Sequence, residues 1–200
     1  MKIDHLISDA DGVLINSHEI ACVNAHKIVS LFNEGKPFEH LFEIKKHFNR
    51  KAQIEIVGEK ESDILRALHR LLMRHSSNQI HCFDEVVEIY KKLKPKKTIV
   101  TSAFASGIRE ILGENAKDFP NILGRESGRK SEILKGLVTG NEIYVTDSVR
   151  DIYICKEIGM PVIATGWGYD EAEHLNAQTP DFFVNNPNEL NSLFYKLNLI

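Results

Sequence analysis

Apolar and polar residues follow two different patterns along this chain. After about residue 80, short apolar runs alternate with segments in which apolar residues recur at helical spacing. Another short apolar run stands near the start of the chain, and residues 16–78 between these parts have helical spacing. The pattern predicts strands at residues 3–8, 98–102, 121–123, 143–146, 161–165 and 181–184.

Alternating strands and helices are typical of a parallel sheet, because parallel neighbours need a crossover connection between them. We therefore expect an α/β fold with a doubly wound (Rossmann-like) parallel sheet and helices on both faces. The helical stretch separates the first strand from the others. It is predicted to be a helical cap of residues 16–78, inserted into a core domain of residues 1–15 and 79–200.

The composition sets broad limits on function. A chain of 200 residues that is 42% hydrophobic can form one core and a small insertion. Lys and Arg number 25 against 28 Asp and Glu, and there is no long basic block, so no nucleic-acid partner is expected. No segment approaches the roughly 20 apolar residues of a membrane span, and the N-terminus lacks the apolar stretch of a signal peptide.

The cysteines indicate a compartment. Three of them lie far apart without a C-x-x-C pair: Cys22, Cys82 and Cys155. This usage favours reduced thiols over a disulfide or a zinc site. We expect a cytoplasmic protein with no membrane association.

Acidic and hydroxyl residues follow three of the predicted strands: Asp9 and Asp11, then Thr101 and Ser102, then Asp147 and Asp151. Ligands of open parallel sheets bind at the carboxyl ends of the strands, so these side chains are expected to meet at one edge. Each residue taken singly could be an ordinary helix cap. Several acids at one edge require a cation, however, and this favours a metal site.

Oxygen ligands without a nearby His or Cys cluster indicate Mg²⁺ rather than zinc. Magnesium sites commonly combine carboxylates with phosphate oxygens of a substrate. Thr101 and Lys130 would then surround a phosphoryl group together with the metal. Of two acids at one strand end, one can attack phosphorus and the other can transfer the proton. A spacing of two residues places both on one side of an extended segment.

Four segments, in this order, resemble the motifs of the haloacid dehalogenase-like hydrolase superfamily. S-D-A-D-G-V-L resembles the first motif, D-x-D-G-[TV], and I-V-T-S resembles the second. Lys130, at the start of a predicted helix, resembles the third, and Y-V-T-D-S-V-R-D-I resembles the fourth. K-E-I-G-M-P-V-I-A-T-G-W-G-Y and P-D-F-F-V-N-N-P-N-E-L are similar to the phosphoglycolate-phosphatase-like branch, which has a small helical cap. The resemblance covers residues 1–18 and 80–195.

The resemblance implies a magnesium-dependent phosphatase that acts through an aspartyl phosphate. Asp9 would be the nucleophile and Asp11 the general acid and base. Thr101 would bind the phosphoryl oxygens, and Lys130 would offset the charge of Asp9 and the phosphate.

The resemblance also implies the metal ligands and the phosphate cradle. The metal would be held by Asp9, the backbone carbonyl of Asp11 and Asp147, with Asp151 bound directly or through water. Backbone N–H groups at residues 10–12, which include Gly12, and at Ser102 would bind phosphate.

The sequence departs from the family's pattern at two positions. Ser131 follows the third-motif lysine, where proline is common, and Thr146 precedes the fourth-motif aspartate, where glycine or an acid is usual. Because other cations lie close to the third motif, three residues are alternatives to Lys130: Arg125, Arg129 and Lys135.

The cap is expected to close over the site and to select the substrate. Two residues are candidates for substrate contacts, His18 near the first motif and Arg50 within the cap, and each could equally be an ordinary surface residue. A closing cap favours a small phosphorylated metabolite as the partner. The chain is expected to be a monomer or a weak homodimer.

Several other functions remain open. A sugar phosphomutase shares all four motifs, and a non-catalytic phosphate- or metabolite-binding member shares the fold. A phosphonatase would need a cap lysine, for which Lys45, Lys46 and Lys51 are available. A dehalogenase needs neither a metal nor an acid at Asp11. No G-x-G-x-x-G follows the first strand and no Walker motif is present, so a dinucleotide-binding or ATP-driven function is disfavoured.

Overall fold

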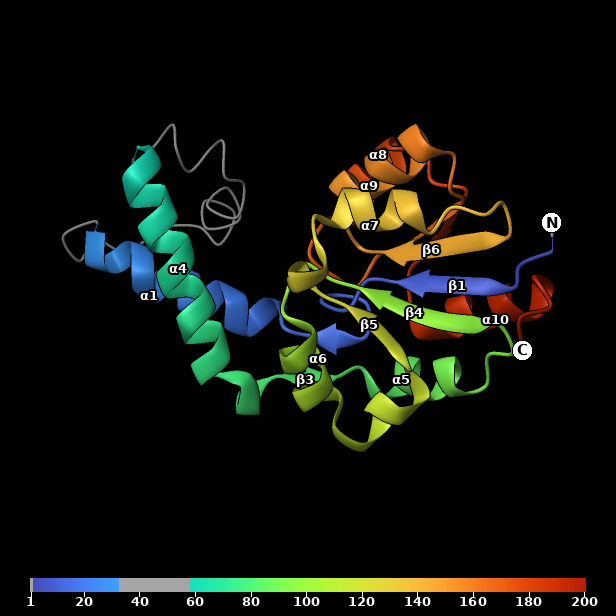
Figure 1. Cartoon of the computed structure of the whole chain (residues 1–200), viewed down its shortest axis with the longest axis horizontal. Helices are drawn as coiled ribbons and strands as arrows, with labels where there is room; N and C mark the ends of the chain where they lie inside the picture. Colours follow the sequence, from blue (N-terminus) through green and yellow to red (C-terminus); the bar gives the residue numbers. More distant parts are fainter. Residues whose placement is uncertain (1, 33–57) are drawn as a thin grey trace. The chain divides into compact units, whose positions relative to one another are not determined.

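A six-stranded parallel sheet organises most of the chain (Figure 1). The computed structural model describes residues 2–32 and 58–200. The strands lie in the order β5-β4-β1-β6-β7-β8, and all neighbouring pairs in this sheet are parallel. They are β1 (His5–Ser8), β4 (Lys96–Val100), β5 (Asn121–Leu123), β6 (Glu142–Thr146), β7 (Val162–Thr165) and β8 (Phe182–Val184). The predicted α/β fold with a parallel sheet is confirmed.

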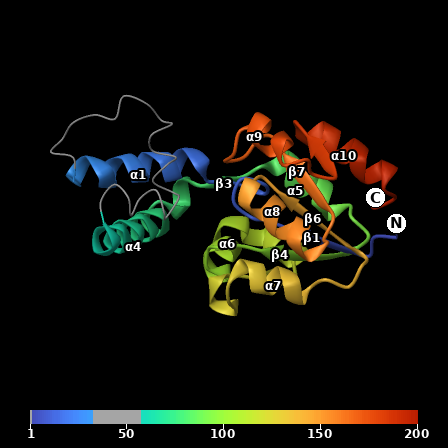
Figure 2. The same ribbon diagram turned by 90° about the horizontal axis from the view of Figure 1, so that it is seen from above.

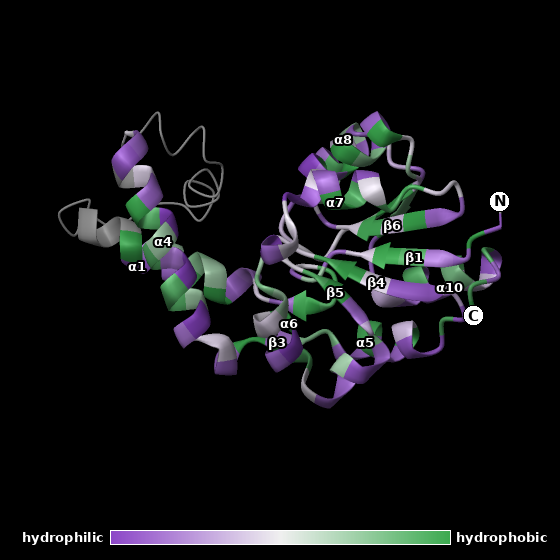
Figure 3. Cartoon of the chain, in the orientation of Figure 1, coloured by the Kyte–Doolittle hydropathy of each residue, from purple (hydrophilic) through white to green (hydrophobic). Residues whose placement is uncertain are grey.

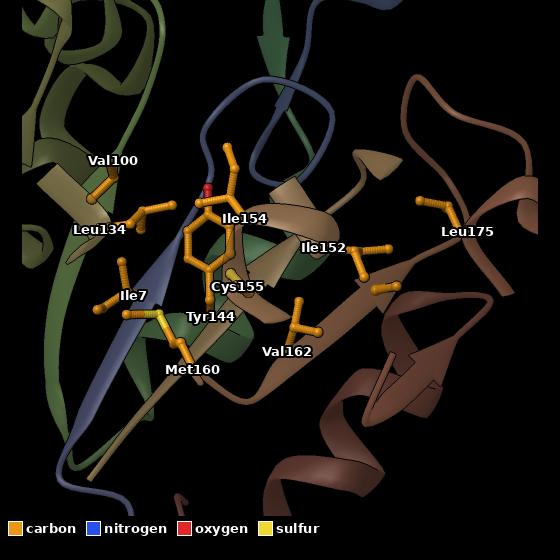
Figure 4. Packing of buried hydrophobic residues seen from close by; sticks show 11 residues of the cluster. Ile7, Val100, Leu134, Tyr144, Ile152, Ile154, Cys155, Met160, Val162 and Leu175 are labelled. Atoms are coloured by element: carbon orange, nitrogen blue, oxygen red, sulfur yellow. The ribbon is translucent and has the colours of Figure 1, made fainter. Parts of the chain in front are cut away.

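Helices lie on both faces of this sheet, as expected for a doubly wound fold. They are α5 (Asp84–Lys91), α6 (Ala105–Leu112), α7 (Lys130–Gly136), α8 (Val149–Ile158), α9 (Ala172–Ala177) and α10 (Pro187–Lys196), with short 3₁₀ turns η2 (Gly113–Asp118) and η3 (Arg125–Ser127). Ile7 of β1 packs in one buried cluster with Leu134 of α7 and Ile152 of α8 (Figure 4). The next residue, Ser8, hydrogen-bonds the phenol of Tyr90 in α5 at 3.0 Å. Because successive strand residues point to opposite faces, α5 and the α7–α8 pair cover different sides.

The strand ends differ by a few residues from the predicted ones. β4 begins at Lys96, two residues before the predicted start, and its backbone pairs with His5 of β1. Strand pairing uses backbone groups, so charged side chains at the solvent-facing end of a strand do not interrupt it. Figure 3 shows this amino-terminal edge as hydrophilic and the middle of β1 and β6 as hydrophobic.

A turn and a short antiparallel pair follow β1. Gly12 has a φ of 75°, a conformation that residues with a side chain rarely adopt. The chain then forms β2 (Ile15–Asn16), which pairs with β3 (His81–Cys82). This pair was not predicted, because two-residue strands are too short to show an alternating pattern.

Contacts between residues divide the chain into two compact units, Met1–Asn16 with His81–Ile200, and Ser17–Ile80. The second unit contains α1 (His18–Phe32), α4 (Glu59–His75) and η1 (Ser77–Gln79). Helices α1 and α4 lie side by side in both views (Figures 1 and 2), and His69 of α4 hydrogen-bonds the carbonyl of Ala21 at 3.1 Å. That this unit acts as a cap remains a prediction.

The apolar residues of the second unit are only partly buried. Ala21, Ala25 and Ile28 of α1 are buried together with Leu65 of α4. Ile64 and Leu71 of the same helix are 53% and 64% exposed. They lie seven residues apart, so they share one side of α4, about 100° around the helix from Leu65.

Residues 33–57 of the predicted helical stretch lie outside the described residues. Among the helices of residues 2–32 and 58–200, none has the length and the apolar character that a membrane span requires.

Glu142 anchors the start of β6, next to β1. It is 1% exposed, and its carboxylate accepts hydrogen bonds from the N–H and hydroxyl of Thr139, both at 2.7 Å, and from the N–H groups of Gly140 and Asn141. Burial favours the protonated form, but the hydrogen bonds from Thr139 and its neighbours outweigh this effect and lower the pKa of Glu142.

We expect Glu142→Gln to lower the free energy of unfolding by about 1–2 kcal/mol near neutral pH. Because the pKa of Glu142 is lowered on folding, its stabilisation is present above the unfolded value of about 4.3 and is lost as the pH falls through the folded value. Urea unfolding near neutral pH and near pH ~3 measures both effects. The exposed Glu173→Gln is the control. Equal midpoints for Glu142→Gln and the unmodified chain at neutral pH would contradict the expected effect.

Candidate active site

Three neighbouring strands bring Asp9, Thr101 and Asp147 to the carboxyl edge of the sheet. β1 lies between β4 and β6, so the residues that follow these strands are neighbours. The N–H of Asp9 donates to the carbonyl of Val145 at 2.8 Å, which continues the pairing with β6 past the end of β1. All three side chains belong to buried residues. Strand order reverses between β1 and β6, the place where α/β sheets bind ligands.

Lys130, the first residue of α7, supplies the positive charge at this edge. Its Nζ donates to Oδ2 of Asp9 at 2.6 Å and also forms an ion pair with Asp151. The side chains of all three residues are at most 11% exposed. None of the three alternative cations is paired with these acids in the described part of the chain. The geometry therefore brings Lys130 to Asp9, as the third motif implied.

Asp151 is held by three donors. Its Oδ2 accepts from Lys130, from the phenol of Tyr144 at 3.1 Å and from the hydroxyl of Thr146 at 3.3 Å. The same Thr146 hydroxyl accepts the N–H of Ser148 at 3.2 Å. The departure from the family's pattern at position 146 therefore adds a hydroxyl that bridges the turn and Asp151. Lys130 also lies 5.6 Å from the centre of the Tyr144 ring.

The acids outnumber the cation in this buried cluster. Burial raises the pKa of Asp9 well above its usual range, while the charge of Lys130 opposes this and Asp151 adds to it. Burial would lower the pKa of Lys130, but Asp151 and Asp9 outweigh it and the pKa rises. Burial raises the pKa of Asp147 to about 7, although the N–H of Tyr169 and the charge of Lys130 act in the other direction. One ammonium group therefore faces three carboxyl groups.

The turn after β1 carries Asp11 and Gly12. The N–H of Ala10 donates to Oδ1 of Asp9 at 2.7 Å, and the N–H of Gly12 donates to the carbonyl of Ile15 at 2.8 Å. Asp11 is half-buried in this turn. Its predicted position beside Asp9 assumed an extended segment, but β1 ends at Ser8 and the chain bends at Ala10. The turn, rather than strand alternation, positions Asp11.

Thr101 and Ser102 follow β4. Oγ1 of Thr101 accepts the N–H of Ala103 at 3.0 Å, so its hydroxyl hydrogen remains available to a ligand. Ser102 is exposed at the same edge. These positions are compatible with the predicted phosphate contacts.

The two candidates for substrate contacts belong to residues 17–80, outside the unit that carries this edge of the sheet. His18 belongs to the second unit, where its Nε2 lies 3.5 Å from the thiol of Cys22. Arg50 lies outside the described residues, as do the three lysines that a phosphonatase could use. The predicted roles of all these residues stay predictions.

The donor set fits a hard divalent cation, although no closed metal cage is assembled. Across the described ranges, no group of three or more His, Cys, Asp or Glu residues has the arrangement of a metal site. Oxygen donors and the excess of buried negative charge nevertheless suit Mg²⁺, which needs only one or two carboxylates from the protein. Asp147 has the fewest compensating partners among the three acids and is the most suitable ligand.

Sequence reasoning missed three features of this site: Tyr144, the bridging role of Thr146, and the N–H of Tyr169, which donates to Oδ2 of Asp147 at 2.6 Å. Tyr144 and Thr146 are two residues apart in β6, so the alternation of strand side chains already indicated that both lie on one face of the sheet. The contact of Tyr169 is made by its backbone, which leaves no trace in residue type.

Comparisons with known proteins agree with this geometry. A family model described as haloacid dehalogenase-like hydrolase matches residues 6–165. A phosphoglycolate phosphatase from Synechococcus elongatus is 31% identical over 84 residues, which are 42% of this chain. The match spans only 40% of the length of that relative.

Solved structures share the fold over nearly the whole chain. A haloacid dehalogenase-like family hydrolase from Streptococcus pneumoniae superposes with a TM-score of 0.81 at 19% identity, covering 96% of this chain and 98% of its own. A predicted phosphatase from Clostridium acetobutylicum gives a TM-score of 0.82 at 16% identity, covering 98% of this chain and 100% of its own. At these identities the likeness shows the fold alone.

We expect Asp147→Asn to stabilise the metal-free chain by about 1–3 kcal/mol near pH ~8. The pKa of Asp147 is raised to about 7 in the folded chain, above the unfolded value of about 3.9, so ionisation costs stability as the pH rises between these values. Asparagine keeps an oxygen for the N–H of Tyr169 but carries no charge. Urea unfolding in chelator near pH ~8 and near pH ~4 should show a difference that disappears at the lower pH.

Asp181→Asn is a matched control, because its exposed carboxylate also accepts a backbone N–H, that of Val162 at 2.9 Å. A metal-free Asp147→Asn chain that is less stable than the unmodified one near pH ~8 would contradict the expected stabilisation.

Proposed function

The chain belongs to the haloacid dehalogenase-like hydrolase family, and we propose that it is a magnesium-dependent phosphomonoesterase acting on a small phosphate ester. One observation carries the proposal: the buried carboxylate of Asp9 lies at the end of the central strand and is 2.6 Å from the ammonium group of Lys130. A nucleophilic carboxylate must be ionised, and burial alone works against ionisation. The charge of Lys130 acts against this effect, because it favours the ionised form of Asp9.

Asp9 attacks phosphorus in this proposal. The N–H of Ala10 donates to Oδ1 of Asp9, and Lys130 donates to Oδ2. These two hydrogen bonds fix the plane of the carboxylate, which favours one direction of attack. The new bond joins a carboxylate oxygen to phosphorus as the bond to the leaving alcohol breaks. Water then attacks the aspartyl phosphate, which releases phosphate and restores Asp9.

Lys130, Thr101 and Ser102 bind the phosphoryl group. Lys130 neutralises charge that gathers on the phosphoryl oxygens, and the free hydroxyl hydrogen of Thr101 donates to one of them. Tyr144 and Thr146 also donate hydrogen bonds to Asp151. Asp151 therefore keeps Lys130 in place, and its own orientation does not depend on the lysine alone. We therefore assign Asp151 mainly to positioning Lys130. Its second carboxylate oxygen remains available for a metal contact through water.

Asp11 transfers the proton. It gives a proton to the leaving alcohol and later takes one from the attacking water. Its half-buried position in the turn after β1 gives it access to solvent, which a group that exchanges a proton in each turnover needs.

Asp9, Asp147 and the backbone carbonyl of Asp11 would hold Mg²⁺. When bound, the ion supplies a Lewis acid that offsets phosphoryl charge. Its positive charge also answers the excess of buried carboxyl groups, which Lys130 alone does not balance.

The substrate is a small phosphorylated metabolite in this proposal. The partial similarity to a phosphoglycolate phosphatase makes 2-phosphoglycolate the first ester to test. Residues 16–78, the predicted cap, would select the leaving group. A phosphopeptide that is hydrolysed faster than any small ester would contradict this substrate class.

We expect phosphate release from a panel of small esters to require Mg²⁺ and to cease in chelator. Asp9→Asn should lower kcat by about 10³-fold or more, because it removes the nucleophile. Asp4→Asn, an exposed substitution just before β1, is the control and should retain activity. Undiminished phosphate release by Asp9→Asn would overturn the nucleophile assignment.

We expect Asp11→Asn to slow both the formation and the hydrolysis of the phosphorylated enzyme by about 10²–10⁴-fold. Rapid-quench measurements with a labelled ester resolve the two steps. Binding of Mn²⁺, followed by electron paramagnetic resonance, should persist in Asp11→Asn, because only the backbone of residue 11 contacts the metal. A loss of Mn²⁺ affinity equal to that of Asp147→Asn would contradict this role.

A further inference from the structure

The segment Gly166–Asp170, which follows β7, has no part in the mechanism above. The N–H of Gly166 donates to the carbonyl of Val184 in β8 at 2.9 Å. The indole N–H of Trp167 donates to the carbonyl of Val13 at 3.3 Å, in the turn after β1. The segment is thus tied both to the sheet and to the turn that carries Asp11.

This segment encloses the carboxylate of Asp147. The N–H of Tyr169 donates to Oδ2 of Asp147 at 2.6 Å. Gly12 and Gly168 both lie so close that a Cβ atom on either would overlap this oxygen. Because Oδ2 is confined by two glycines and one N–H, the orientation of the carboxylate is restricted, and Oδ1 is the oxygen that a cation would bind.

Asp170 links the segment to the turn that bears Asp147. Its N–H donates to the carbonyl of Asp147 at 3.3 Å, and its Oδ2 accepts the N–H of Val149 at 2.8 Å. Val149 is the first residue of α8, and Ser148, at the N-cap position, makes no capping hydrogen bond with its side chain. Asp170, which lies 21 residues further along the chain than Val149, therefore caps the start of α8 in place of a local residue.

We propose that Asp170 is a positioning residue, which fixes the turn of residues 147–149 and thereby aims Asp147 at the metal. This inference rests on the proposed function, because it assumes that Asp147 binds the metal. Outer-shell partners that orient a ligand typically change metal affinity about 10–100-fold. A residue that only capped α8 would change stability and leave metal affinity unaltered.

Titration of the chelator-stripped protein with Mn²⁺, followed by electron paramagnetic resonance, tests the proposal without reference to activity. We expect Asp170→Ala to weaken Mn²⁺ binding about tenfold or more. Asp170→Asn keeps an oxygen acceptor for the N–H of Val149 and should remain within about threefold of the unmodified chain. Asp170→Glu keeps the charge but displaces the carboxylate, so it should weaken binding even if Asp170→Ala does not fold.

Asp181→Ala is the matched control. Asp181 also accepts a backbone N–H across a similar separation, that of Val162, but it makes no contact with the Asp147 turn in the described structure. It should lower stability and leave the Mn²⁺ affinity unchanged.

The outcomes separate the two proposals. Normal Mn²⁺ affinity in Asp170→Ala and Asp170→Glu, with affinity lost in Asp147→Asn, overturns the positioning role and leaves the proposed function standing. Equal weakening in Asp170→Ala and Asp170→Asn also overturns it, because the charge rather than the hydrogen bond would then be responsible. Normal affinity in Asp147→Asn overturns the metal assignment of the proposed function itself.

Discussion

The site depends on one electrostatic constraint, which is that three carboxyl groups are buried with a single ammonium group. Charges interact strongly and are poorly solvated in such a position, so each carboxyl group must find a partner or take up a proton. Lys130 is paired with Asp9 and Asp151. Asp147 forms no ion pair with a residue that the structure describes, and its pKa rises to about 7. This acid therefore has the greatest need of a further cation.

A buried acid at the opposite edge of the sheet shows the other solution. Glu142 has almost no exposed surface, but it lies at the rim of the sheet, and its pKa is lowered because Thr139 and two further N–H groups donate to it. The carboxylate of Asp147 accepts one hydrogen bond from another residue, the backbone N–H of Tyr169. Depth of burial and the number of donors together distinguish an acid that stabilises the fold from an acid that is left ready for a ligand. A fully satisfied Asp147 would gain less from binding a metal.

The sequence was sufficient to predict that Asp9, Thr101 and Asp147 meet, because the carboxyl ends of parallel strands share one edge. It also favoured Lys130 through its place at the start of a helix. The support around them was harder to predict. Tyr169 contacts Asp147 through its backbone N–H, and Asp170 contacts Val149, which is distant in the sequence. Neither contact therefore depends on a local sequence pattern.

The donors around Asp151 acquire a reason in the proposed reaction. If Asp9 is phosphorylated as proposed, more negative charge would lie beside Lys130 and would draw the lysine toward the phosphoryl group and away from Asp151. An acid that depended on Lys130 alone would then be buried without a partner, at a cost of several kcal/mol. The hydroxyls of Tyr144 and Thr146 keep Asp151 hydrogen-bonded through that change. Asp151 can therefore share the lysine with the reacting group and hold it again when phosphate leaves.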